Sequence, residues 1–127
     1  MSTAAVILAT IVRVIDGDTI IINMKECNQP IVCENLSVRI ANIDTPELHT
    51  KCPTEKILAE QARRVTSAYF PVGAVMPLNI IVGSEKYGRL MTTHKILEEA
   101  LLTQGLAVPY HGEKKSKDWC GIYNEAP

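Results

Sequence analysis

A nearly unbroken run of β-branched residues, from Val6 to Ile22, is the feature that most constrains the fold of this chain. Such residues favour strands because their branched side chains pack well on a pleated surface. Only "DGD" at positions 16–18 interrupts the run, and an Asp-Gly pair flanked by β-branched residues is typical of a tight hairpin turn. The sequence therefore predicts a hairpin that turns at Asp16-Gly17 and sets a second carboxylate, Asp18, at the start of its second strand.

The rest of the chain contains further segments with strand-like alternation and two segments with helical spacing. Segment 31–43 alternates as a strand does, and 75–91 is typical of two short strands joined by a turn around Gly83 to Gly88. Apolar residues at helical spacing predict a helix that begins near Pro53 and stops at "FPVG", and a second helix over 95–104. In the third strand, the expected alternation sets Val38, Ile40 and Asn42 against Arg39, Ala41 and Ile43.

The order strand, strand, strand, helix, strand, strand, helix predicts a mainly β, α+β fold. It matches a five-stranded OB-like Greek-key β-barrel with two to three α-helices. The 127 residues fit a single domain over 1–127, in which 111–127 form a polar surface tail. We expect a monomer.

Charge and hydropathy narrow the classes of partner. Thirteen basic and fourteen acidic residues give a formal charge of -1, so no global field draws polyanions, and any nucleic-acid binding must be local. The apolar stretch "AAVILATIV" is too short to cross a bilayer and lacks the basic start of a signal peptide, so we interpret it as a strand.

The cysteines leave two interpretations open. The four cysteines, at positions 27, 33, 52 and 120, include no C-x-x-C pair, which argues against a zinc site despite three histidines. An even count allows two disulfides, and buried free thiols are the alternative.

Four motifs carry candidate chemistry: "DGDT" at 16–19, "RIANIDTPE" at 39–47, "KYGR" at 86–89 and "GLAVPY" at 105–110. The first two supply Asp18 and Asp44, short carboxylates at the ends of neighbouring strands. Such hard oxygens suit Ca²⁺ when a backbone carbonyl and waters complete the coordination. The alternative role of each aspartate is to form a turn or cap a strand end.

Arginines from two separate motifs complete the candidate site. A phosphodiester gains charge on its non-bridging oxygens as phosphorus becomes five-coordinate, and guanidinium groups bind such oxygens in a bidentate manner. Arg39 and Arg89 can therefore clamp a phosphoryl transition state. The alternative is an arginine that is solvated or paired with a surface carboxylate.

Taken together, the four motifs resemble the staphylococcal-nuclease (thermonuclease) family over residues 10 to about 110. The resemblance implies a calcium-dependent phosphodiesterase, an endonuclease that cuts DNA with little sequence preference and leaves 3′-phosphate ends, with RNA open as a second substrate. It implies one Ca²⁺ ion as cofactor and single-stranded or locally open DNA as partner. The family and the cysteines together favour an extracytoplasmic location.

The resemblance also assigns roles around the metal. It implies that Asp18, Asp44 and the backbone carbonyl of Thr45 hold the ion. Asp16 matches a carboxylate that hydrogen-bonds water around the ion rather than touching the ion.

The remaining roles concern the substrate. The resemblance implies that Arg39 and Arg89 clamp the phosphate and that Glu47 orients, and can deprotonate, the attacking water. A favourable place near a helix start is the alternative for Glu47. Three further residues match substrate-binding positions: Lys86, Tyr87 and Tyr110, the first two on a phosphate and the last under a base.

Two departures from the family pattern stand out. The stretch "LMTTHKILEEALLTQ" is compact, so we expect a shortened last hairpin, which leaves open how the final strand closes the barrel and how Arg89 is supported. Cys52 can be tied to Cys120, which would hold the tail at the edge of the site.

Two other functions compete with the nuclease. The first is a non-catalytic nucleic-acid- or protein-binding OB-type module of the same family. A degenerate module would be expected to lose charged site residues, and all of these are present: Asp18, Arg39, Asp44, Glu47 and Arg89. The second is a disulfide-stabilised or metal-binding structural protein, which only the cysteines support.

Overall fold

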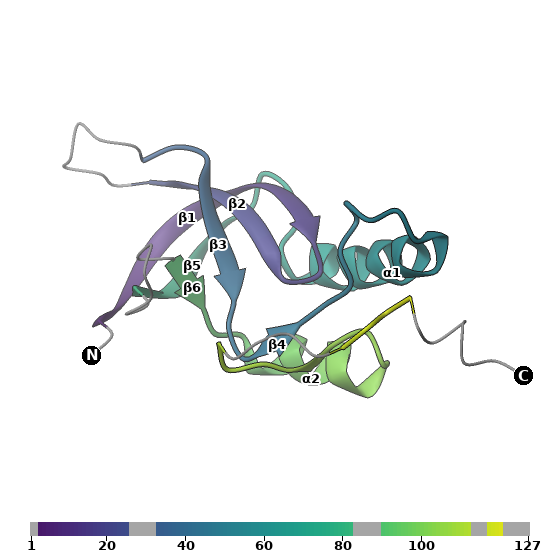
Figure 1. The fold of residues 1–127 in the computed structure, drawn as a ribbon. Helices are drawn as coiled ribbons and strands as arrows, with labels where there is room; N and C mark the ends of the chain where they lie inside the picture. The colour runs from purple at the N-terminus through teal and green to yellow at the C-terminus, as the bar shows by residue number, and fades with distance from the viewer. Residues whose placement is uncertain (1–2, 26–32, 83–89, 113–116, 121–127) are drawn as a thin grey trace, which may run out of the picture.

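The structure is a computed structural model that describes residues 3–25, 33–82, 90–112 and 117–120. Its elements follow in the order β1 (Thr3–Asp16), β2 (Thr19–Met24), β3 (Leu36–Ile40), β4 (Ile43–Asp44), α1 (Pro53–Tyr69), β5 (Val75–Val82), β6 (Leu90–Thr92), α2 (Lys95–Thr103) and β7 (Val108–Pro109) (Figure 1). Five strands form a closed barrel in the order β1-β2-β3-β6-β5, and β4 pairs with β7 in a separate two-stranded sheet. The predicted α+β fold with an OB-like barrel is confirmed.

The long strand β1 pairs with two neighbouring strands. Residues 3–10 pair with β5, and residues 9–16 pair with β2, both in antiparallel register. Register shifts between Ile11 and Arg13, and again between Val14 and Asp16, interrupt the β1–β2 ladder. Irregularities of this kind bend a strand and increase its twist, which allows one strand to lie on two sides of a small barrel.

Strand β6 closes the barrel in spite of its three residues. Val38, Arg39 and Ile40 of β3 lie parallel to it, and Ile80 to Val82 of β5 lie antiparallel on its other side. The expected pair of strands over 75–91 is therefore confirmed as β5 and β6. The expected turn between them falls at 83–89, outside the described residues.

The hairpin turn lies one residue later than the sequence predicts. Asp16 pairs with Thr19, so Gly17 and Asp18 are the two loop residues. Neither has a positive φ, so the turn does not need glycine for its backbone conformation. A Cβ at Gly17 would instead lie 2.8 Å from the Ala62 Cβ of α1 and 3.0 Å from the side chain of Thr45. Glycine is required here because a helix and a loop pack directly against the tip of the hairpin.

The predicted strand over 31–43 is divided by a turn. Strand β3 ends at Ile40, and Asn42 has a φ of 71°, in the left-handed region that Asn tolerates better than most residues. The chain then continues as β4, so Asn42 is exposed and does not share the buried face of Val38 and Ile40. The alternation fails beyond Ile40 because a strand period does not continue through a turn.

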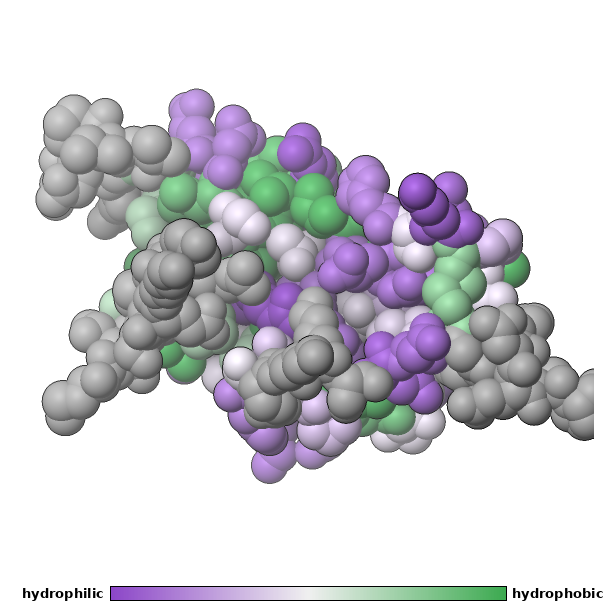
Figure 2. Space-filling view, in the orientation of Figure 1, coloured by the Kyte–Doolittle hydropathy of each residue, from purple (hydrophilic) through white to green (hydrophobic). Residues whose placement is uncertain are grey.

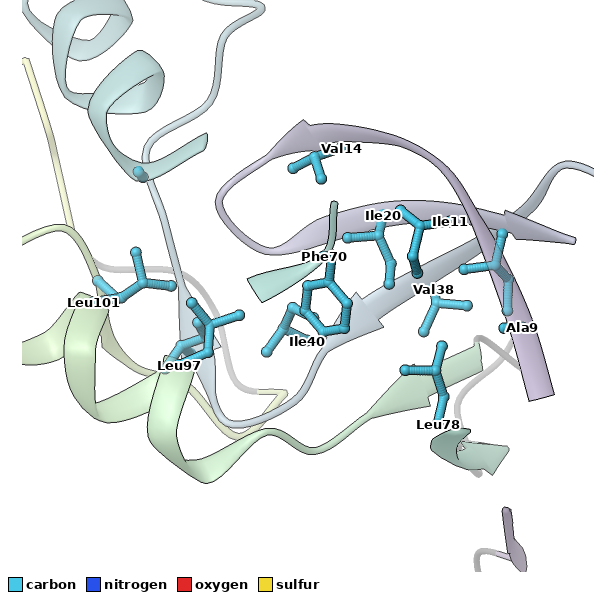
Figure 3. Close-up of a cluster of buried hydrophobic side chains, with 14 of the residues drawn as sticks. Ala9, Ile11, Val14, Ile20, Val38, Ile40, Phe70, Leu78, Leu97 and Leu101 are labelled. Atoms are coloured by element: carbon cyan, nitrogen blue, oxygen red, sulfur yellow. The ribbon is translucent and has the colours of Figure 1, made fainter. Parts of the chain in front are cut away.

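Both predicted helices are confirmed. Helix α1 begins at Pro53 and ends before Phe70, and α2 ends before Gly105, whose φ of 71° suits a helix terminator. Phe70 is fully buried and lies among side chains of the barrel and of α2 (Figure 3). The two helices therefore share one core with the barrel, and the buried members of that core include Ile11, Ile20, Val38, Ile40, Leu78, Leu97 and Leu101.

The end of the chain is tied to the start of α1. Cys120 forms a disulfide with Cys52, the residue before Pro53, and Trp119 beside it is 5% exposed. Cys33 is also disulfide-bonded, so no described cysteine is a free thiol, whereas Cys27 lies outside the described residues. Over the described part of the chain, no helix is long and apolar enough to cross a membrane.

Replacing Gly17 by alanine tests the contact between hairpin and helix. We expect Gly17→Ala to lower the free energy of unfolding by about 1–3 kcal/mol, because the added methyl group overpacks the contact with Ala62. In an Ala62→Gly background, which removes the 2.8 Å contact, the same change is expected to cost less. Urea denaturation of the four proteins measures this, and an equal cost in both backgrounds would contradict the account.

Candidate functional site

Three charged residues from separate elements meet at one end of the barrel. Asp18 is in the β1–β2 turn, Arg39 is on β3 and Asp44 is on β4. The β2–β3 pairing sets Thr19 opposite Arg39, and the Ile40 N–H donates to the Asp18 carbonyl oxygen at 2.7 Å. Backbone pairing alone therefore places the first aspartate beside the strand that carries the arginine, as the sequence predicts for strand ends.

Arg39 lies between the two carboxylates. Its Nη2 is 3.3 Å from Asp18 Oδ2 and 3.5 Å from Asp44 Oδ1, and it donates to the Ile43 carbonyl oxygen at 3.2 Å. The aspartates are each 4% exposed, and the arginine side chain is 12% exposed. One guanidinium nitrogen thus faces two buried carboxylates, an arrangement in which each charge depends on the others for compensation.

Asp18 accepts further hydrogen bonds that fix its orientation. The Thr45 N–H donates to Asp18 Oδ2 at 3.2 Å, and the Thr19 hydroxyl donates to Oδ1 at 3.0 Å. Thr45 is almost fully buried, yet its Oγ1 has no hydrogen-bond partner among the described residues. An unsatisfied buried oxygen is uncommon and requires an explanation, such as a ligand or a water at this place.

Asp16 stands behind Asp18 as a third carboxyl group. The Asp18 N–H donates to Asp16 Oδ1 at 3.3 Å. Burial, followed by the negative charge of Asp18 and a hydrogen bond between the two side chains, raises the pKa of Asp16 to about 7. The cluster therefore favours a proton on Asp16 when no other cation is present.

Helix α1 supports the hairpin tip from behind. The Thr66 hydroxyl donates to the Gly17 carbonyl oxygen at 2.6 Å, and both groups are buried. Sequence reasoning did not identify Thr66. Its position one helical turn after Ala62, on the inward side of an amphipathic helix, is a signal that could have singled it out.

Helix α2 supports the β3–β4 turn in a similar way. Glu98 Oε1 accepts from Asn42 Nδ2 at 3.1 Å, and Glu98 Oε2 accepts from the His94 N–H at 2.7 Å. His94 caps the helix, since its Nδ1 accepts from the Leu97 N–H at 3.1 Å. Glu98 thus ties the start of α2 to the turn that leads into Asp44, a second contribution that the sequence did not reveal.

Tyr110 lies at the same end of the barrel. Its N–H donates to the Asn42 carbonyl oxygen at 2.9 Å, and the Arg39 guanidinium carbon is 5.3 Å from the centre of its ring. This is within the range of a cation–π interaction. Strand β7, which precedes Tyr110 and pairs with β4, was not predicted because two paired residues leave no periodic signal.

Of the remaining candidates, the structure describes Glu47 alone. Glu47 is exposed on the loop after Pro46, and its N–H donates to Glu55 Oε2 at 3.0 Å. The "KYGR" motif, with Lys86, Tyr87 and Arg89, lies outside the described residues. Of the seven candidates that the structure describes, it brings six together, namely Asp16, Asp18, Arg39, Asp44, Thr45 and Tyr110.

The donor set fits a hard cation. Asp18 and Asp44 both direct a carboxylate oxygen at Arg39 Nη2, and Thr45, whose hydroxyl has no hydrogen-bond partner among the described residues, donates its N–H to Asp18. Hard oxygens of this kind are the ligands that Ca²⁺ prefers. Among the described residues, Arg39 is the arginine that faces both carboxylates. No cluster of three or more His, Cys, Asp or Glu side chains in a metal-binding arrangement occurs among the described residues, so waters and backbone oxygens would have to complete the coordination.

The surface around the site is polar. Figure 2 shows hydrophilic residues gathered over the middle of the face seen in Figure 1, between the barrel strands and α1.

Neither a protein-family model nor a curated protein matches the sequence of this chain. The resemblance to the staphylococcal-nuclease family thus depends on the motifs themselves.

The proton on Asp16 predicts how stability changes with pH. Asp16 has a pKa near 3.8 in the unfolded chain and a pKa of about 7 in the folded chain. Between pH 3.8 and pH 7 the folded chain therefore holds a proton on Asp16 that the unfolded chain has released. The stabilisation from this group is full below pH 4 and is lost as pH rises to 7, on the order of 4 kcal/mol. Without divalent cations, Asp16→Asn is expected to remove this loss.

Urea denaturation at pH 4 to 8 in EDTA measures this dependence. Glu99→Gln, which removes an exposed carboxyl group on α2, serves as the matched control and should follow the wild type. A stability difference between wild type and Asp16→Asn that stays constant over this pH range would disprove the shared proton.

Proposed function

We propose that this protein is a calcium-dependent phosphodiesterase that cuts DNA, and RNA as a second substrate, with little sequence preference. The observation that carries the proposal is the meeting of Asp18, Arg39 and Asp44 at one end of an OB-like barrel. OB-type barrels present grooves that bind single strands. The motif resemblance supports the same conclusion from the sequence, and the proposal makes the chain a member of the staphylococcal-nuclease family.

Burial of the carboxylates supports a functional role over a turn-forming one. A turn aspartate is ordinarily solvated, whereas Asp18 and Asp44 are nearly buried and share one guanidinium between them. A buried arginine–carboxylate cluster is weak evidence for stability alone, so its burial favours a functional role. The orphaned Thr45 Oγ1 at the same place adds to this argument.

The chain's own residues would divide the chemistry as follows. Asp18 and Asp44 would hold the ion, which supplies positive charge that offsets the phosphate and polarises water. Arg39 would donate to the non-bridging oxygens, with Arg89 as a second guanidinium. Glu47 would accept the proton of the attacking water as the water oxygen bonds to phosphorus. The bond from phosphorus to O5′ then breaks, which leaves a 3′-phosphate and, after protonation of O5′, a 5′-hydroxyl.

Substitution of Asp44 and Arg39 tests the activity. We expect Asp44→Asn to abolish calcium-dependent cleavage of single-stranded DNA, because it removes one of the two carboxylates. Arg39→Lys keeps the positive charge but not the bidentate geometry, and it is expected to lower kcat by a factor on the order of 10³. Gel assays with end-labelled oligonucleotides measure both effects and read the end chemistry.

Arg64→Lys is the matched control, since Arg64 lies on the exposed side of α1 and is 76% exposed. Cleavage that persists in EDTA and in Asp44→Asn would exclude the proposed mechanism. Tight binding of oligonucleotides without any cleavage would favour the non-catalytic OB-type module instead.

A further inference from the structure

A second concave site adjoins the carboxylate cluster along the chain. A cavity of about 490 Å³ opens beside the start of α1 and is lined by Leu48, His49, Thr50, Lys51 and Lys56. Its first lining residue directly follows Glu47, and Thr45 is three residues before it. Three residues span at most about 11 Å of extended chain, so Leu48 lies within that distance of Thr45, whose N–H donates to Asp18.

The loop that forms the cavity is held at several points. The Cys52 N–H donates to Thr50 Oγ1 at 3.2 Å, and the Thr50 N–H donates to the Leu48 carbonyl oxygen at 3.0 Å. Glu55 accepts from the Glu47 N–H, and Cys52 is tied to Cys120. The disulfide and these hydrogen bonds give the loop a defined shape, so the cavity wall is preformed.

The charged residues that line the cavity are basic. Lys51 and Lys56 are exposed, and neither forms an ion pair among the described residues. None of the lining residues is acidic, and Leu48 and His49 add surfaces against which a base or sugar can pack. Two unpaired ammonium groups around a cavity suit an anion, and lysine is a common phosphate ligand.

We propose that this cavity binds a backbone phosphate of a single-stranded polynucleotide on one side of the scissile bond. The inference rests on the proposed function, because the cleaved strand must pass the carboxylates and continue along the surface. OB folds bind about 4–16 nucleotides, more than the carboxylate cluster can contact. With a net charge of -1, the chain needs such a local cationic site to hold a long substrate.

Neutralising the two lysines tests the cavity directly. The probe is a fluorescein-labelled oligothymidylate of about 12 nucleotides, titrated in EDTA so that binding is measured without cleavage. We expect Lys51→Gln/Lys56→Gln to weaken binding on the order of tenfold and to lower the salt slope by about 0.7, for the one phosphate charge that is no longer neutralised. Lys51→Arg/Lys56→Arg is expected to restore the binding.

The matched control is Lys25→Gln/Lys95→Gln, which makes the same change of net charge at two exposed lysines outside the cavity. With Ca²⁺ present, the cavity variant should raise KM for the 12-mer but not for a dinucleotide, which carries no flanking phosphate. Equal weakening by the control and cavity variants, or no weakening by either, would overturn the proposal.

The two proposals fail in different ways. If wild type binds the oligonucleotide through these lysines but does not cut it with Ca²⁺, the phosphodiesterase fails and the phosphate site stands. If wild type cuts the oligonucleotide and the lysine variants bind and cut it equally well, only the phosphate site fails.

Discussion

The charge balance around Arg39 determines what this end of the barrel can do. Asp18 and Asp44 are nearly buried and both face Arg39 Nη2, so each carboxylate depends on nearby positive charge and hydrogen bonds for compensation. In the absence of other cations, Asp16 takes up a proton near neutral pH. If the proposed cation binds, it offers a compensating charge in place of that proton, and the stability of the fold should then depend on the cation.

The geometry of this cluster depends on packing outside it. Helix α1 presses Ala62 against Gly17 and bonds Thr66 to the Gly17 carbonyl oxygen, so the turn that carries Asp18 is fixed from behind. On the other side, Glu98 of α2 holds Asn42 before β4. The barrel, as Figure 1 shows, brings these turns to the end that faces the helices, and a site built on such supported turns keeps its shape without a substrate.

The sequence predicts the helices and strands whose hydrophobic pattern extends over many residues, and it predicts the site residues that belong to a recognisable motif. Strands β1 and β2 and both helices carry enough alternating or helical pattern to be recognised, and β2–β3 pairing then brings Asp18 near Arg39. The packing role of Gly17 could not be predicted, because it depends on a helix that is distant in the sequence. Strand β7 and the turn at Asn42 were missed for another reason: pairing of two residues and a single left-handed residue produce no period.

A calcium titration followed by the backbone amide resonances of Asp18 and Thr45 tests most directly whether the carboxylate pair is a cation site. The account predicts saturable binding of one ion per chain, with a Kd on the order of 10⁻⁴–10⁻³ M for so few protein carboxylates. Binding should be lost in Asp18→Asn and retained in Glu99→Gln. Absence of any shift in the wild type, or equal binding by Asp18→Asn, would contradict it.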